Sequence, residues 1–279
     1  MVRYIALMLA LLMALGICAG VGGFAGLQWL WILPLAFLGS FLGLAAVLFL
    51  VLCIASWTVD LEKPQKKDNP FYRGLIYMVA DFAIWVLRVR IHTVGLEKLP
   101  KNGRFFLVCN HLHLVDPVML LATMKKGQLA FIAKRESKTM FLVGKLMHKI
   151  MCQFINREND REALKTIINC IRLIQEDQVS VGVFPEGRIT GDDLLHPFRS
   201  GVFKIAQKTK VPIVVCTLQN TQNVFRNAKK LKPTDVQLHL VDVVQPEDFE
   251  SLTTVDIANR IHAMMAEDLG PELVWQETT

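Results

Sequence analysis

The sequence predicts an α/β domain with a mostly covered sheet and flanking helices, preceded by an N-terminal transmembrane helical hairpin. Two patterns support this: an uncharged apolar stretch at the start of the chain, and short apolar runs that alternate with helical stretches from Ile91 onward. The length of 279 residues suffices for one sizeable domain with additions. We therefore expect three regions: a transmembrane hairpin at 1–60, a linker and amphipathic membrane-proximal helix at 61–90, and a cytoplasmic domain at 91–279.

The first region is apolar throughout. No charged side chain stands between Arg3 and Asp60. Because about 20 apolar residues cross the hydrocarbon core of a bilayer, this stretch is long enough for two crossings. The break between them is expected at 26–29, which contains the polar Gln28 and an interfacial tryptophan.

Charges at the ends of this region predict its orientation. Arg3 precedes the first helix, and lysines at 63, 66 and 67 follow the second. Positive charge marks the cytoplasmic side, so we expect an integral membrane protein, in a bacterial cell membrane, with everything after Asp60 on the cytoplasmic face. A secretory signal peptide is the alternative for residues 1–20, but the apolar character continues well past any cleavage point.

The second region begins with a polar linker at 62–70 that contains two prolines. Residues 71–90 then mix apolar side chains with charged ones and predict an amphipathic helix. Such a helix either lies on the bilayer or docks onto the domain as one of its core-facing helices, and the pattern leaves both interpretations open.

In the third region, the strands are expected at 104–109, 128–133, 151–155, 179–184, 212–218 and 236–242, and the helices at 117–125, 139–149, 159–176, 200–209 and 254–268. Asn159 or Asp160 is expected to cap the longest helix. Its apolar face is assigned to Ile167, Ile168, Ile171, Leu173 and Ile174.

Composition limits the function. The chain is 52% hydrophobic and carries a net charge of +6, which suits an anionic membrane surface or a phosphorylated substrate. It has no basic tract interleaved with aromatic residues, so nucleic acid is not an expected partner. The six cysteines are scattered singly and are expected to be reduced core thiols. Cys109 could be proposed as a nucleophile, but its position in a strand predicts a packed thiol.

The loop that follows the strand expected at 104–109 is the most informative segment of the chain. It reads Asn-His-Leu-His-Leu-Val-Asp-Pro over 110–117 and places His111 five residues before Asp116. A tight turn can bring the carboxylate back to one imidazole nitrogen. That contact would fix the tautomer and leave the other nitrogen free to take a proton, which is the core of a general-base site.

Three further segments stand at strand ends, where α/β domains place their chemistry. They are Phe-Ile-Asn-Arg ending at Arg157, Phe-Pro-Glu-Gly-Arg over 184–188, and Val-Pro-Ile over 211–213. Together with the His-x4-Asp pattern of the loop, these four blocks resemble those of the glycerolipid acyltransferase family, in the same order and with sensible spacing over residues 70–240.

The best-known activity in that family is 1-acyl-glycerol-3-phosphate acyltransferase, which forms phosphatidic acid. The resemblance implies an acyl-CoA or acyl carrier protein co-substrate, a lysophospholipid acceptor at the bilayer, and neither a resident cofactor nor a metal. It implies His111 as the base and Asp116 as its support. It also implies that Arg157 grips the acceptor phosphate, and that Glu186, Gly187 and Arg188 complete the acceptor pocket.

Departures from the family pattern keep alternatives open. Arg188 follows the glycine directly, where a threonine usually comes first, and Cys216 stands where proline is common. The first departure resembles acyltransferase domains that use other lysolipids, so a different acceptor is possible. His111, His113 and Asp116 could instead begin the site of a metal-dependent hydrolase. A non-catalytic membrane scaffold is a third alternative.

Overall fold

The computed structural model describes residues 2–276 of the chain, and their side chains from Tyr4 onward. Residues 1 and 277–279, at the ends of the expected hairpin and domain, lie outside the described residues, as does the side chain of Arg3. The chain divides into two compact units, Met1–Asp60 and Leu61–Thr279, so the stretch 61–90 groups with the second unit.

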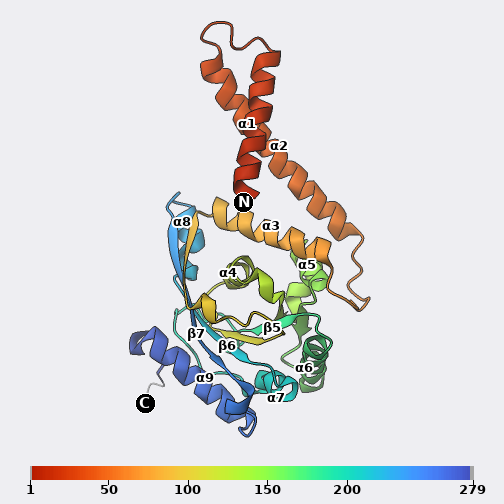
Figure 1. The fold of residues 1–279 in the computed structure, drawn as a ribbon, viewed down its shortest axis with the longest axis vertical. Coiled ribbons are helices and arrows are strands. Elements are labelled where there is room, and N and C mark those ends of the chain that lie inside the picture. The colour runs from red at the N-terminus through yellow and green to blue at the C-terminus, as the bar shows by residue number, and fades with distance from the viewer. Residues whose placement is uncertain (1, 277–279) are drawn as a thin grey trace. The chain divides into compact units, whose positions relative to one another are not determined.

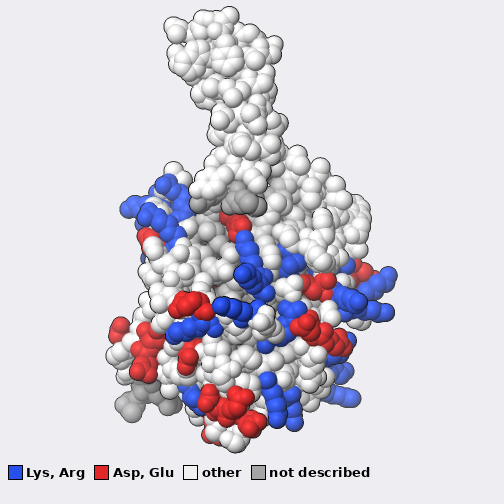
Figure 2. All heavy atoms as spheres, viewed as in Figure 1, with Lys and Arg blue, Asp and Glu red and all other residues white. Residues whose placement is uncertain are grey.

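The first unit is a pair of apolar helices, α1 (Val2–Gly20) and α2 (Trp29–Trp57), with the expected break between them. Ala10, Ala14 and Cys18 are buried on α1, which packs against α2. Over the described side chains of these helices, the face shown in Figure 2 carries no Lys, Arg, Asp or Glu. Among the described residues, α2 is long and apolar enough to cross a membrane, whereas α1 is shorter, so a second crossing stays a prediction.

The second unit contains a seven-stranded sheet, as the α/β prediction requires. All neighbouring strands are parallel except the pair β6 and β7. Across the sheet the strands run β1 (Val89–Val94), β7 (Thr234–Val244), β6 (Ile213–Gln219), β2 (Phe106–Cys109), β5 (Ser180–Val183), β3 (Leu129–Lys134) and β4 (Gln153–Ile155). The fold class is therefore confirmed, and β1 is the strand that the sequence pattern missed.

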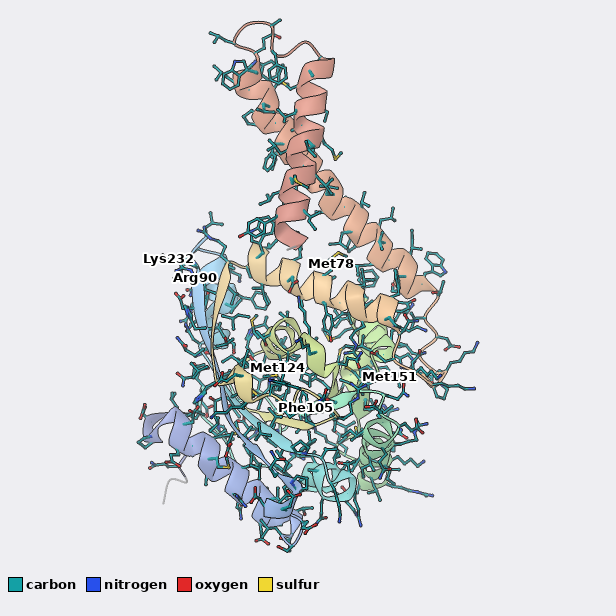
Figure 3. All side chains as sticks on the ribbon, in the orientation of Figure 1. Met78, Arg90, Phe105, Met124, Met151 and Lys232 are labelled. Carbon is teal, nitrogen blue, oxygen red and sulfur yellow. The ribbon has the colours of Figure 1, made fainter. Side chains whose placement is uncertain are left out.

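Helices cover both faces of this sheet (Figure 1). One layer comprises α6 (Asp160–Gln175), α7 (Lys204–Thr209) and α9 (Thr254–Leu269), which share a core with β2, β5 and β6. The other comprises α3 (Pro70–Val86), α4 (Asp116–Thr123) and α5 (Val143–Lys149). Phe105, Met124 and Met151 are among the large side chains that are almost completely buried (Figure 3).

Helix α3 packs on the domain. Asn69 caps it by accepting hydrogen bonds from Phe71 N–H and Tyr72 N–H, and Pro70 begins the first turn. The buried Arg73 pairs with Asp68 and also donates to two backbone carbonyls, at 129 and 150. A buried guanidinium with so many partners fixes α3 to the body of the domain. Of the two interpretations of this helix, the one in which it docks onto the domain therefore agrees with the structure.

Most of the remaining predictions are confirmed to within a few residues. Asn159 caps α6 by accepting a hydrogen bond from Glu162 N–H. One residue of the predicted apolar face was wrong: Ile168 is 53% exposed, whereas Cys170 occupies a fully buried position on that helix. The short helix α8 (Val224–Ala228) was not predicted.

Candidate active site

The sheet topology brings three of the four predicted segments together, whereas Val-Pro-Ile over 211–213 begins β6 and lies at the opposite edge, beside the start of β2. Strands β2, β5, β3 and β4 are successive neighbours and all run parallel. Their carboxyl ends therefore lie along one edge of the sheet. The loop 110–117 follows β2, the turn 184–188 follows β5, and Arg157 follows β4. Segments that are up to 75 residues apart in sequence are adjacent here, as the hydrogen bond between His111 and Glu186 illustrates.

His111 and Asp116 make the contact that their spacing predicts. The imidazole Nδ1 lies 2.8 Å from the Asp116 Oδ2. That oxygen also accepts hydrogen bonds from the backbone N–H groups of Leu112 and His113, at 2.7 and 2.8 Å. The carboxylate is completely buried at the start of α4, while the imidazole retains 18% of its exposure and lines a cavity. Since an ionised carboxylate can only accept, the proton sits on Nδ1 and leaves the lone pair on Nε2.

Two neighbours hold this loop and ring in position. Phe184 stacks on the His111 ring, with the ring centroids 4.2 Å apart. Asn110, just before the histidine, forms two hydrogen bonds with the backbone of Leu218 at the end of β6, at 2.7 and 2.9 Å. Phe184, directly after β5, therefore fixes the orientation of the His111 ring, and the bonds to β6 fix the loop that carries it. The sequence pattern singled out neither Phe184 nor Asn110 for this role.

The side chain of Glu186 also contacts the loop 110–117, by accepting a hydrogen bond from the loop's backbone. Its Oε1 accepts from His111 N–H at 2.7 Å, and its Oε2 accepts from His196 N–H at 3.0 Å. Burial, together with the repulsion from Asp116 and Asp192, raises the pKa of Glu186 to about 7, although the two N–H groups oppose this shift. Both oxygens are engaged within the protein, and Glu186 does not line the cavity that contains His111. Its predicted place in the acceptor pocket stays a prediction.

Arg157, Gly187 and Arg188 line the same cavity as His111. Arg157 donates a hydrogen bond to the carbonyl of Gly187. Burial lowers the pKa of Arg157, and the nearby cation of Arg199 lowers it further. Gly187 has a φ of 79°, and a Cβ at this position would lie 3.0 Å from the Arg199 Nε. Glycine is thus needed both for the left-handed turn and for the close approach of Arg199, a cation that the sequence pattern did not assign to the site.

The cavity itself is mostly apolar and measures about 450 Å³. It extends from His111 and Arg157 between α3, α4 and α5. Its apolar walls include Ile76, Val79, Ala80, Ala83, Leu114, Val118, Leu121, Phe131, Val143 and Leu146. His111, supported by the buried Asp116, and two arginines therefore open onto a space of the kind that holds an alkyl chain.

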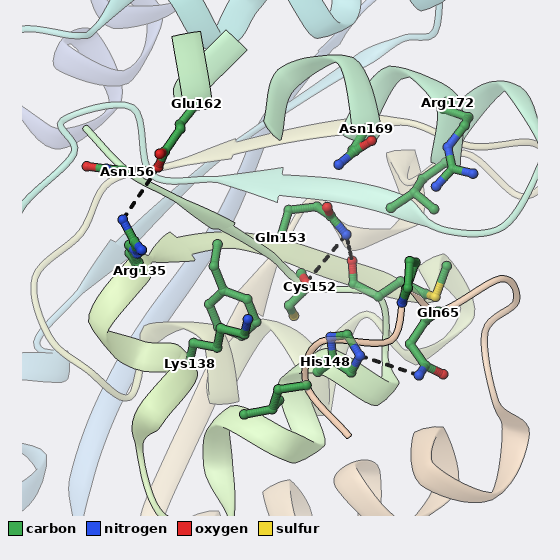
Figure 4. Close-up of a pocket in the computed structure, with 15 residues that line it drawn as sticks. Gln65, Arg135, Lys138, His148, Cys152, Gln153, Asn156, Glu162, Asn169 and Arg172 are labelled. Carbon is green, nitrogen blue, oxygen red and sulfur yellow. Dashed lines mark hydrogen bonds and ion pairs between the residues drawn. The ribbon is translucent and has the colours of Figure 1, made fainter. Parts of the chain in front are cut away.

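A second cavity of about 390 Å³ lies beside β4 and α6 (Figure 4). It is more polar, but its charged side chains have partners within the protein. Arg135 lies 3.5 Å from Glu162, which also accepts a hydrogen bond from Asn156, and Lys138 pairs with Glu62. These ion pairs offset the positive charge of the cavity.

The alternative chemistries fit this arrangement less well. Cys109 is completely buried, and burial, with repulsion from Cys216, Asp116 and Glu186, raises the pKa of its thiol well above the usual value. Cys109 is therefore a packed core thiol, as its position in a strand predicted. Among the described residues, no three His, Cys, Asp or Glu side chains lie close enough together to hold a metal ion. The His113 ring packs edge-on against Phe225 instead, with the ring centroids 5.1 Å apart.

Comparison with known proteins identifies relatives of the domain that carries this site. Residues 90–219 match the model of the Acyltransferase family. The chain is 29% identical over 187 residues to a 1-acyl-sn-glycerol-3-phosphate acyltransferase from Cocos nucifera, a match that covers 67% of this chain and 60% of that protein. It is 29% identical over 180 residues to the Borreliella burgdorferi protein of the same description, covering 62% of this chain and 71% of the relative. The corresponding Bacillus subtilis protein is 28% identical over 172 residues, covering 61% and 84%.

A solved structure shares the fold. The 1-acyl-sn-glycerophosphate (LPA) acyltransferase, PlsC, from Thermotoga maritima superimposes with a TM-score of 0.59 at 20% sequence identity. The match covers 99% of this chain and 100% of that one.

Proposed function

We propose, because residues 90–219 match the model of the Acyltransferase family, that the chain transfers a fatty acyl group from an acyl thioester to the free hydroxyl of a lysophospholipid. The acceptor proposed is 1-acyl-glycerol-3-phosphate, the substrate in the names of its relatives, and the product is then phosphatidic acid. The single observation that carries this proposal is the 2.8 Å contact between Asp116 and His111, which lies on the wall of an apolar cavity that also contains Arg157.

In this proposal His111 is the general base. Its Nε2 takes the proton of the acceptor hydroxyl while that oxygen attacks the thioester carbonyl carbon. The carbon–sulfur bond then breaks, and the departing thiolate takes the proton back from the imidazolium. Asp116 stabilises the imidazolium charge from its buried position. An ester is formed directly, the thioester serves as a co-substrate, and no resident cofactor takes part.

Arg157 and Arg188 would bind the acceptor phosphate. A guanidinium can contact two phosphate oxygens at once, and Arg157 is half-buried beside the cavity wall. The carbonyl of Gly187 orients Arg157, and the nearby Arg199 adds positive charge. The apolar part of the cavity would hold an acyl chain between α3, α4 and α5.

The first unit would hold the enzyme at its lipid substrate. Helix α2 has the length and composition of a membrane-spanning helix. With α1 it would form an integral hairpin in a bacterial cell membrane, with the catalytic domain on the cytoplasmic face.

A different lysolipid acceptor is the second candidate, because Arg188 stands where the family pattern has threonine and Thr190 is turned to Asp192 instead. The purified full-length chain should be assayed against a panel of lysolipids, each with acyl-CoA and with acyl carrier protein donors. Transfer to lysophosphatidic acid that is lost in His111→Ala would support the proposal. Transfer to another lysolipid alone would select the second candidate, and full activity in His111→Ala would refute the mechanism.

A further inference from the structure

A cationic segment, formed by most of α8 and the turn that follows it, plays no part in the chemistry proposed above. We refer to residues 225–232 as the basic turn. Its exposed cations are Arg226, Lys229, Lys230 and Lys232, and no acidic residue occurs anywhere between 194 and 234. Figure 2 shows a cluster of basic side chains over this part of the domain, and Lys232 is labelled there in Figure 3. Two apolar side chains accompany the cations: Phe225 is 43% exposed and Leu231 is 75% exposed.

The exposure of Leu231 is built into the fold. Its carbonyl accepts a 2.6 Å hydrogen bond from the Arg88 guanidinium, and its N–H donates to the carbonyl of Ala228. Leu231 also has a φ of 55°, a left-handed conformation that a residue with a Cβ adopts only at a cost. A large apolar side chain is thus held out of the domain between lysines, by contacts that fix its backbone. Exposed apolar side chains flanked by lysines are typical of segments that enter the headgroup layer of a membrane.

The basic turn lies beside the active-site loop. Phe225 packs edge-on against the ring of His113, and the backbone N–H of His113 donates to the catalytic-site carboxylate of Asp116. The next residue, Leu114, is 68% exposed and also lines the apolar cavity. The mouth of the cavity and the basic turn therefore belong to the same rim of the domain, through direct contact.

We propose that the basic turn is a lipid-docking element of the catalytic unit, which binds the surface of an anionic phospholipid bilayer. The lysines would meet lipid phosphates, while Leu231 and Phe225 would enter the region between headgroups and acyl chains. This contact is separate from the apolar N-terminal helices. It rests on the proposed function for its purpose, since it would bring the mouth of the cavity against the layer that holds the acceptor. The charge pattern favours an anionic lipid surface over a protein partner.

The position of the turn can be tested without an activity assay. The full-length Leu231→Trp variant is reconstituted into vesicles of phosphatidylcholine, with or without phosphatidylglycerol that is brominated on its acyl chains. The added tryptophan emission, measured against the wild-type background, should be quenched by the brominated lipid. Leu164→Trp is the matched control, because Leu164 is 43% exposed on α6. Equal quenching of both variants, or quenching of neither, would overturn the proposal.

The charge requirement needs a second comparison. Lys229→Gln, Lys230→Gln and Lys232→Gln are combined, and the control removes three exposed lysines from α7 and its C-terminal end, as Lys204→Gln, Lys208→Gln and Lys210→Gln. Acyl transfer is measured in neutral detergent micelles that contain either phosphatidylcholine or phosphatidylglycerol. Each lysine near an anionic surface favours docking by about five-fold at low salt. The acceptor KM of the wild type and of the control should therefore fall on the anionic surface, whereas the triple variant should lose most of that decrease.

The same assay separates the two proposals. If no protein transfers an acyl group, the proposed function fails, and the quenching experiment still decides whether the turn enters the lipid. If the wild type is active but the triple variant keeps the full response to anionic lipid, the docking proposal alone is wrong.

Discussion

The buried carboxylate of Glu186 holds the backbone of His111, whose N–H donates a 2.7 Å hydrogen bond to the Glu186 Oε1. The other oxygen receives the N–H of His196 at 3.0 Å. One side chain thus joins the loop after β2 to the segment after the turn 184–188. The position of the imidazole depends on this carboxylate as well as on Asp116.

The substitution Glu186→Gln should change how stability depends on pH. The pKa of Glu186 is raised by burial from 4.5 to about 7 in the folded protein. As the pH rises from about 4.5 to 7, the unfolded chain releases this proton first, so the folded state of the wild type loses stability, by up to roughly 3 kcal/mol. Glutamine does not titrate, so the variant should lack this decrease. Unfolding midpoints of both proteins in detergent, measured from pH 4.5 to 8, would test this, and parallel curves would contradict it.

The substitution Asp116→Asn should separate charge from shape. Asp116 Oδ1 is buried without a hydrogen-bond partner among the described residues, so an amide nitrogen can take its place. The amide oxygen can still accept from the loop, but the negative charge that supports the imidazolium is lost. We expect kcat to fall by roughly a thousandfold or more, with little change in the acceptor KM. A large rise in KM with an unchanged kcat would show that Asp116 acts in binding.

The parts of the site that depend on local spacing could be predicted from the sequence. His111 and Asp116 are five residues apart in one loop, so a tight turn was enough to bring them together. The placement of Arg157 beside Gly187 could also be expected, because parallel strand ends share an edge of the sheet.

The parts that depend on tertiary packing could not be predicted. The two backbone hydrogen bonds that engage Glu186 arise only when His111 and His196 come together in the fold. The strand at 89–94 was missed because it contains Arg90 and His92 and lies at an exposed edge of the sheet. The exposure of Ile168, by contrast, follows from the helical period: it lies about 100° beyond Ile167 around α6, away from the face that contains Cys170 and Leu173.

Replacement of Arg157 should act on acceptor binding. If its guanidinium contacts the phosphate, Arg157→Ala removes a charged hydrogen bond, so the KM for lysophosphatidic acid should rise by roughly 10- to 100-fold. Arg157→Lys should recover only part of this loss, because an ammonium group cannot reproduce the two-point contact. Arg172→Ala, in the second cavity, is the matched control and should leave the KM unchanged. If Arg157→Ala altered the KM of the acyl donor alone, the phosphate assignment would be wrong.

The apolar cavity offers a final prediction about chain length. Ala83 lines the cavity from α3, whereas Val86, three residues later on the same helix, is 52% exposed and lies outside its lining. Ala83→Phe should fill part of the 450 Å³ and shorten the longest acyl chain that the enzyme uses, because a packed interior cannot expand to admit the extra ring. Val86→Phe adds a ring on the same helix without entering the cavity and should leave the preference unchanged. Competition between thioesters of different chain length measures the preference directly. The same shift in both variants would show that the effect comes from α3 as a whole. No shift in Ala83→Phe would mean that the acyl chain binds elsewhere.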